Sequence, residues 1–106
     1  MNAFEKQVDI LARLAQLMLD QIDNPYDSIT CEYEYMGRYG TVSSSLSVML
    51  DGARTHPDTA PEFATDNLEL CMKLRELMKG HTGGNWTSFT LSLDASGGAR
   101  TRFDYS

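Results

Sequence analysis

The sequence is poor in the residues with which small proteins bind metals or cross-link themselves. It has two cysteines and two histidines in 106 residues. Two cysteines without clustered histidines cannot form a zinc site, so we expect no metal and no other cofactor. Cys31 and Cys71 fall at inward-facing positions of an expected strand and an expected helix. We interpret them as buried core residues in a reducing compartment, and a disulfide between them is the alternative.

Long apolar segments and an excess of positive charge are also missing. No apolar run reaches the ~18 residues of a membrane span. Residues 1–6 lack the basic patch and apolar block of a signal peptide, so we expect a cytoplasmic protein that does not bind a membrane. Nine Lys and Arg against fifteen Asp and Glu give a net charge of −6. This balance argues against direct nucleic-acid binding, and it is compatible with a basic protein partner or simply with solubility.

Recognisable catalytic motifs are scarce as well. His56 lies in a proline-containing segment and His81 beside a glycine-rich one, and neither belongs to a nucleophile motif. Glu32 and Glu34 alternate along an expected strand, which puts their carboxylates roughly 7 Å apart on one face. Two carboxylates at such a distance can serve in hydrolysis, but a pair of this kind is more often a solvated strand face. We predict that the protein is not an enzyme.

Two segments have the apolar periodicity of helices. The first covers residues 3–22 with Asn2 as its N-cap, and the second begins after a cap at Thr65 or Asp66 and ends at Lys79. The first apolar stripe consists of Phe4, Val8, Leu11, Ala15, Met18 and Ile22, with Leu14 beside it. The second stripe consists of Leu70, Cys71, Leu74, Leu77 and Met78.

Alternation with a period of two marks two hairpins. The first joins residues 28–35 to 41–50, and the second joins residues 88–93 to 99–105, each across a glycine-containing turn. Leu91 and Phe103 share one phase of this alternation, so both are expected to be buried. Residues 51–64 contain two prolines and no periodicity, and we predict a loop there.

The element order α-β-β-α-β-β predicts a single α+β domain over residues 1–106. The economical fold is a four-stranded antiparallel sheet with two helices packed on one face. The other face can remain in contact with solvent. The residues expected on that open face are Thr30, Glu32, Glu34, Ser43, Ser45, Ser47, Met49, Trp86, Ser88, Thr90, Ser92, Arg100, Arg102 and Asp104.

The last hairpin carries a family resemblance. Its segments Trp86-Thr87-Ser88-Phe89-Thr90-Leu91 and Phe103-Asp104-Tyr105, around an acidic-small-glycine turn, resemble the C-terminal signature of the YezG-like proteins. These are small bacterial antitoxins, or immunity proteins, of polymorphic toxin systems. The resemblance implies an immunity protein that binds and neutralises a cognate toxin domain, often a nuclease, delivered by contact-dependent inhibition or secretion. The serine-rich residues 43–47 depart from the bulkier residues expected there. A small enzyme or ligand-binding module on the same scaffold is the alternative.

The resemblance also suggests where the toxin would bind. A nuclease site is basic because it holds phosphates, so an acidic surface is the expected contact. We predict that this surface is formed by Glu32 and Glu34 on the first hairpin and by Asp51, Asp58 and Glu62 in the following loop, and that the protein is a monomer in the complex. The alternative is that these are ordinary solvated carboxylates and that contact lies on a helix.

Overall fold

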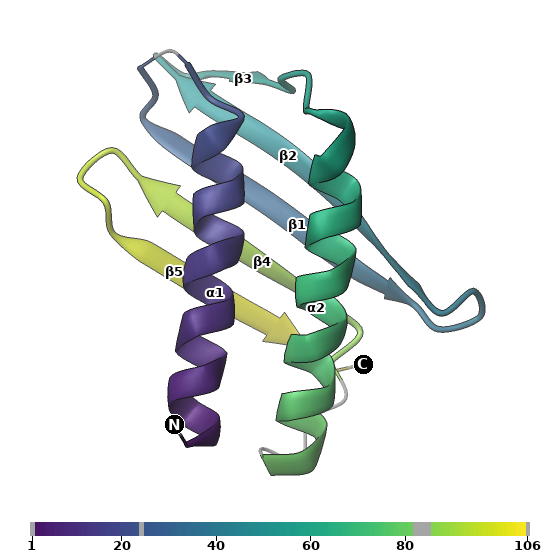
Figure 1. Ribbon diagram of the computed structural model, residues 1–106. Coiled ribbons are helices and arrows are strands. Elements are labelled where there is room, and N and C mark those ends of the chain that lie inside the picture. Colours follow the sequence, from purple (N-terminus) through teal and green to yellow (C-terminus); the bar gives the residue numbers. More distant parts are fainter. Residues whose placement is uncertain (1, 24, 82–85, 106) are drawn as a thin grey trace.

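The computed structural model describes residues 2–23, 25–81 and 86–105. Its strands form one antiparallel five-stranded sheet in the order β3-β2-β1-β4-β5, and both helices cover the same face (Figure 1). The α+β class and the placement of the helices on one face are confirmed. The elements are α1 (Ala3–Asp20), β1 (Ser28–Met36), β2 (Thr41–Leu50), β3 (Ala53–Thr55), α2 (Pro61–His81), β4 (Ser88–Asp94) and β5 (Ala99–Asp104). None of the described helices is long and apolar enough to cross a membrane.

The prediction of four strands is wrong, because the segment predicted to be a loop contains β3. Asp51 and Gly52 have positive φ angles of 52° and 80°. They form a two-residue hairpin turn, and the register then pairs Leu50 with Ala53. The element order is therefore α-β-β-β-α-β-β. An Asp-Gly pair is favoured in such turns because both central residues need positive φ.

The second helix also begins earlier than predicted. α2 starts at Pro61, not after Thr65, and continues to His81, not Lys79. Proline suits the first turn of a helix, because the N–H it lacks would have no partner inside the helix. The additional turn places Phe63 in the core, where 4% of its surface is exposed.

The first helix begins as predicted and ends slightly earlier. The Asn2 Oδ1 accepts a hydrogen bond of 2.8 Å from the Glu5 N–H, which confirms Asn2 as the N-cap. The helix ends at Asp20, and Gln21 is its C-cap. The Gln21 side chain donates to the Leu17 carbonyl and accepts from the Ala60 N–H, so it joins the end of α1 to the segment before α2.

The core lies between the strands β1, β2 and β4 and the two helices. β1 is the central strand, and its register places Cys31 between Leu46 of β2 and Leu91 of β4. Leu14 and Leu74 come down from the helices and are fully buried. Cys31 and Cys71 are both buried and both free, which confirms them as core residues and not a disulfide.

The apolar stripe of α1 is only partly buried. Leu14 and Met18 are fully buried, whereas Phe4 is 72% exposed and Val8 is 50% exposed. The first turns of α1 extend beyond β5, the outermost strand on that side (Figure 1). Phe4 and Val8 belong to the apolar stripe of the predicted helix but do not face the core, because the turns that carry them lie beyond the edge of the sheet.

Trp86 is not on the open face of the sheet, as the alternation predicted, but fully buried. Its ring packs edge-to-face on Phe89 at 4.9 Å between centroids and also contacts Tyr35 and Phe103. Arg75 of α2 lies over the Tyr35 ring at 3.6 Å, and its Nε donates to the Trp86 carbonyl. Trp86 precedes β4, which begins at Ser88, so the alternation of that strand does not fix its direction.

Candidate functional site

The face of the sheet away from the helices is polar, and two glutamates lie at its centre. The register places Glu32 between Ser45 and Thr90, and Glu34 between Ser43 and Ser88. Their neighbour Tyr33 is buried against the helix layer, which fixes both glutamates on the opposite face. Short hydroxyl side chains therefore flank both carboxylates.

These residues line a hollow of about 370 Å³, which we call the carboxylate hollow. The polar residues that line it are Glu32, Glu34, Ser43, Ser45, Ser88, Thr90 and Asp104. Asp104 reaches the hollow from β5. It is the register partner of Ser88 on β4, and its carboxylate accepts a hydrogen bond of 3.5 Å from the Ser88 Oγ. The hollow exists because serines on the strands beside β1 are much shorter than the glutamates between them.

The carboxylate hollow is negatively charged, and none of the described residues that line it is a lysine or an arginine. Glu32 and Glu34 are exposed, and neither forms an ion pair with another residue that the structure describes. Three carboxylates and several hydroxyls offer mainly hydrogen-bond acceptors. Such a surface suits lysine and arginine side chains, which carry donors only.

The described residues do not suggest a metal site or an acid–base pair here. Within residues 2–23, 25–81 and 86–105, no cluster of three or more His, Cys, Asp or Glu side chains could hold a metal ion. His56 Nδ1 lies 3.2 Å from the Leu46 carbonyl, an acceptor, so His56 donates this bond at the β2 edge. The side chain of His81 lies outside the described part. The absence of enzymatic activity stays a prediction.

The other three predicted site residues are not part of the carboxylate hollow. Asp51 lies in the β2–β3 turn, where its N–H donates to Asp27 Oδ2 over 2.8 Å. Asp58 lines a different hollow of about 440 Å³, beside Pro57 and the end of α1. Glu62 is in the first turn of α2, on the helix side of the sheet. The segment after β3 leads from the sheet to the helix layer, so the five predicted carboxylates do not form one surface.

Sequence reasoning did not include Asp104 in the site. The alternation placed Asp104 on the open face, but it could not show that β4 lies directly beside β1. That pairing joins residues far apart in the sequence, such as Glu34 and Ser88, which are 54 positions apart. Only the β1–β4 register brings Asp104 toward Glu34. The pattern within one hairpin does not show which strand of the other hairpin lies beside it.

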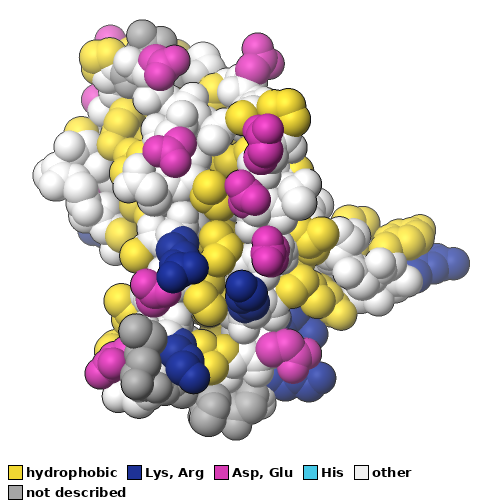
Figure 2. All heavy atoms as spheres, in the orientation of Figure 1, with side chains coloured by type: hydrophobic (Ala, Val, Ile, Leu, Met, Phe, Trp, Pro, Cys, Tyr) yellow, Lys and Arg dark blue, Asp and Glu magenta, His cyan; other side chains and the backbone are white. Residues whose placement is uncertain are grey.

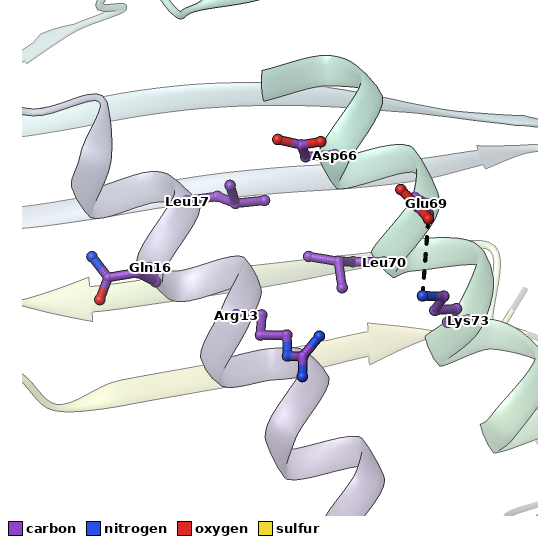
Figure 3. A pocket seen from close by; sticks show the side chains of 7 residues that line it. All are labelled: Arg13, Gln16, Leu17, Asp66, Glu69, Leu70 and Lys73. Atoms are coloured by element: carbon purple, nitrogen blue, oxygen red, sulfur yellow. Dashed lines mark ion pairs between the residues drawn. The ribbon is translucent and has the colours of Figure 1, made fainter. Parts of the chain in front are cut away.

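A further hollow, of about 380 Å³, lies between the two helices (Figure 3). Leu17 and Leu70 point toward one another across it, and charged residues stand at its rim. Three of these charges are paired along their own helices, Arg13 with Asp9 at 3.1 Å and Lys73 with Glu69 at 3.9 Å, and Asp66 forms no ion pair with a described residue. Figure 2 shows acidic side chains alone over the upper half of this helix layer, and acidic and basic side chains together over its lower half. The lining of the interhelical hollow therefore carries charges of both signs and does not favour a partner of either charge.

Comparison with known proteins does not identify a relative. No protein-family model matches the chain, and no curated protein is significantly similar to it. The resemblance of the last hairpin to the YezG-like immunity proteins stays a prediction.

Proposed function

We propose that this protein is an immunity protein that binds and neutralises a cognate bacterial toxin domain through its carboxylate hollow. The observation that carries the proposal is the gathering of Glu32, Glu34 and Asp104 on the sheet face opposite the two helices. The resemblance of residues 86–91 and 103–105 to the YezG-like proteins supports the same function. Action in the cytoplasm, as a monomer in the complex, belongs to this proposal.

The partner that suits this hollow is a basic toxin domain, and a nuclease is the leading candidate. Nucleases hold phosphates with lysine and arginine, and these side chains can enter a hollow lined by carboxylates and serine hydroxyls. Occupying them would keep the nucleic acid out of the toxin's active site. The net charge of −6 would also raise the rate of encounter with a cationic partner.

The desolvation of the carboxylates decides how much this contact contributes. An exposed ion pair contributes under about 1 kcal/mol, whereas close pairs at a tight interface show coupling energies of ~1.5–7 kcal/mol. Glu32 and Glu34 are exposed in the free protein. A toxin that covers the hollow would exclude water from both carboxylates. We therefore expect each of their ion pairs to contribute in the range of ~1.5–7 kcal/mol found at tight interfaces.

Charge reversal at the hollow tests this proposal. A cytotoxic domain identified in the genes beside this one, in inactivated form, would be titrated calorimetrically with the wild type and with the Glu32→Lys/Glu34→Lys variant, at low and high salt. We expect the variant to bind about 100-fold more weakly, or ~2.7 kcal/mol, and to lose most of the salt dependence. The matched control is Glu69→Lys/Glu76→Lys on the exposed side of α2, which makes the same change in net charge.

The control separates a local contact from general electrostatic attraction. If both variants lose affinity equally, only the net charge matters and the hollow is not the contact. Unchanged affinity and unchanged salt dependence in Glu32→Lys/Glu34→Lys would likewise contradict the proposed surface.

A further inference from the structure

Building on the proposed function, we infer that the toxin also contributes an extended segment that pairs with β5 as an added strand. The two edges of the sheet differ. On one edge, β3 is three residues long and pairs only with the end of β2, so residues 41–47 of β2 have no described strand on that side, and His56 donates to one of their carbonyls, that of Leu46. β5 has six residues and pairs only with β4 among the described elements.

The outer edge of β5 presents main-chain groups that do not point toward β4. The Asp94 N–H donates to the Gly98 carbonyl over 2.9 Å, and the register continues from there without interruption along β5. In an antiparallel ladder alternate residues exchange bonds with the neighbouring strand. Arg100, Arg102 and Asp104 therefore bond to β4, whereas Ala99, Thr101 and Phe103 turn their N–H and C=O groups outward. A row of such groups is a template for another strand.

The helix layer extends beyond this edge and leaves apolar side chains uncovered. The first turns of α1 and the last turns of α2 pass beyond β5 (Figure 1). On α1, Phe4 is 72% exposed and Val8 is 50% exposed, although they continue the stripe whose member Leu11 packs on the core. One more strand beside β5 would lie beneath these turns and cover both residues. An added strand would therefore account for the exposure of these two apolar side chains.

The overhanging turns of α1 and α2 also distinguish between two possible partners for the β5 edge, a second copy of this chain and a segment of a different protein. If two copies paired their β5 edges antiparallel around a two-fold axis, both helix layers would lie on the same face of one continuous sheet. The overhanging turns of each copy would then collide with the helices of the other. An extended segment of a different protein has no such layer, so it can enter where a second copy cannot.

Two arginines define the chemistry of that segment. Arg100 and Arg102 lie on the open face of β5, opposite Ser92 and Thr90, and neither forms an ion pair with a described residue. Opposite charges on facing strands stabilise a pair. The complementary segment therefore alternates between acidic residues beside these arginines and apolar residues on the helix side, beneath Phe4 and Val8.

Amide hydrogen exchange of the complex tests this pairing directly. The probe is the same inactivated cytotoxic domain, added to isotopically labelled wild-type protein. We expect the amides of Ala99, Thr101 and Phe103 to exchange roughly tenfold or more slowly in the complex than in the free protein. If the toxin binds and these three amides exchange as before, the added strand is wrong while the proposed function stands. If the wild type does not bind the toxin, both are wrong.

A proline variant gives an independent readout of affinity. Thr101→Pro removes an outward N–H but no bond to β4, so the fold should persist. We expect it to weaken toxin binding roughly tenfold or more, whereas Thr101→Val, which keeps the N–H, should bind as the wild type does. Equal binding by both variants would overturn the inference. Dimeric wild-type protein that Thr101→Pro converts to a monomer would assign the edge to a second copy instead.

Discussion

At the scale of single residues, the aromatic cluster around Trp86 holds the last hairpin to the rest of the molecule. Tyr33 and Phe89 stack at 4.5 Å, and Trp86 packs edge-to-face on Phe89. Phe103 contacts Phe89 at 5.1 Å. Of the residues that carry the family resemblance, Trp86, Phe89 and Leu91 are therefore buried in the core and Phe103 packs against it, and their first role is to join β4 and β5 to β1.

We predict that Trp86→Ala lowers the free energy of unfolding by ~3–5 kcal/mol, the usual cost of removing a large buried aromatic side chain. That loss is comparable to the whole stability of a small domain. Denaturant unfolding followed by circular dichroism would measure it. Tyr39→Ala is the control, because Tyr39 is 70% exposed and its removal should change the free energy by under about 0.5 kcal/mol. A stable Trp86→Ala protein would contradict the assigned core.

The two buried cysteines are expected to lower the stability of the folded protein as the pH rises into the alkaline range. Burial raises the pKa of the Cys31 thiol from its usual value near 9 to about 11, and it also raises the pKa of Cys71. Both thiols are therefore protonated in the folded state over a range where the unfolded chain ionises. The stability that they contribute is complete below pH 9 and is lost as the pH rises toward 11.

We accordingly predict that the melting temperature falls between pH 9 and pH 11, and that Cys31→Ala/Cys71→Ala shows a smaller fall. At neutral pH neither thiol of the native protein should react with a thiol reagent, whereas both should react after denaturation. Rapid labelling of the native protein would show that these side chains are accessible.

At the scale of elements, local patterns predicted most of the structure and failed where one segment carries conflicting signals or where exposure depends on non-local strand pairing. The alternation in residues 28–35 and 88–93 correctly separated the buried face from the open face. The β3 strand was missed because two prolines in 51–64 outweighed the Asp51-Gly52 hairpin signal. The exposure of Phe4 could not be predicted, since it depends on the width of the sheet beneath α1, and that width depends on non-local pairing.

The position of a strand in the sheet should set the cost of the same substitution. Leu91 on β4 is 1% exposed, whereas Phe103 on the edge strand β5 is only partly buried. We predict that Leu91→Asp unfolds the domain, because burying an unpaired carboxylate costs several kcal/mol. Phe103→Asp should leave a folded protein with a lower melting temperature, because its carboxylate can reach water. Thermal melts of both variants would check this order, and equal melting temperatures would contradict it.

At the scale of the whole molecule, the sheet separates two surfaces of different character. The helix layer carries charges of both signs, whose described ion pairs lie within α1 and within α2. The open sheet face concentrates acidic groups at Glu32, Glu34 and Asp104 and places Arg100 and Arg102 near its β5 edge. This division explains how a chain with a net charge of −6 can offer a partner both an acidic hollow and a basic edge.

The most direct test of the proposed function is survival of cells that produce, in active form, a cytotoxic domain identified in the genes beside this one. Co-production of the wild-type protein or of Glu69→Lys/Glu76→Lys should restore growth, and Glu32→Lys/Glu34→Lys, made at the same level, should not. Growth restored equally by all three proteins would contradict the carboxylate hollow as the contact surface. Failure of the wild-type protein to protect the cells would contradict the immunity function itself.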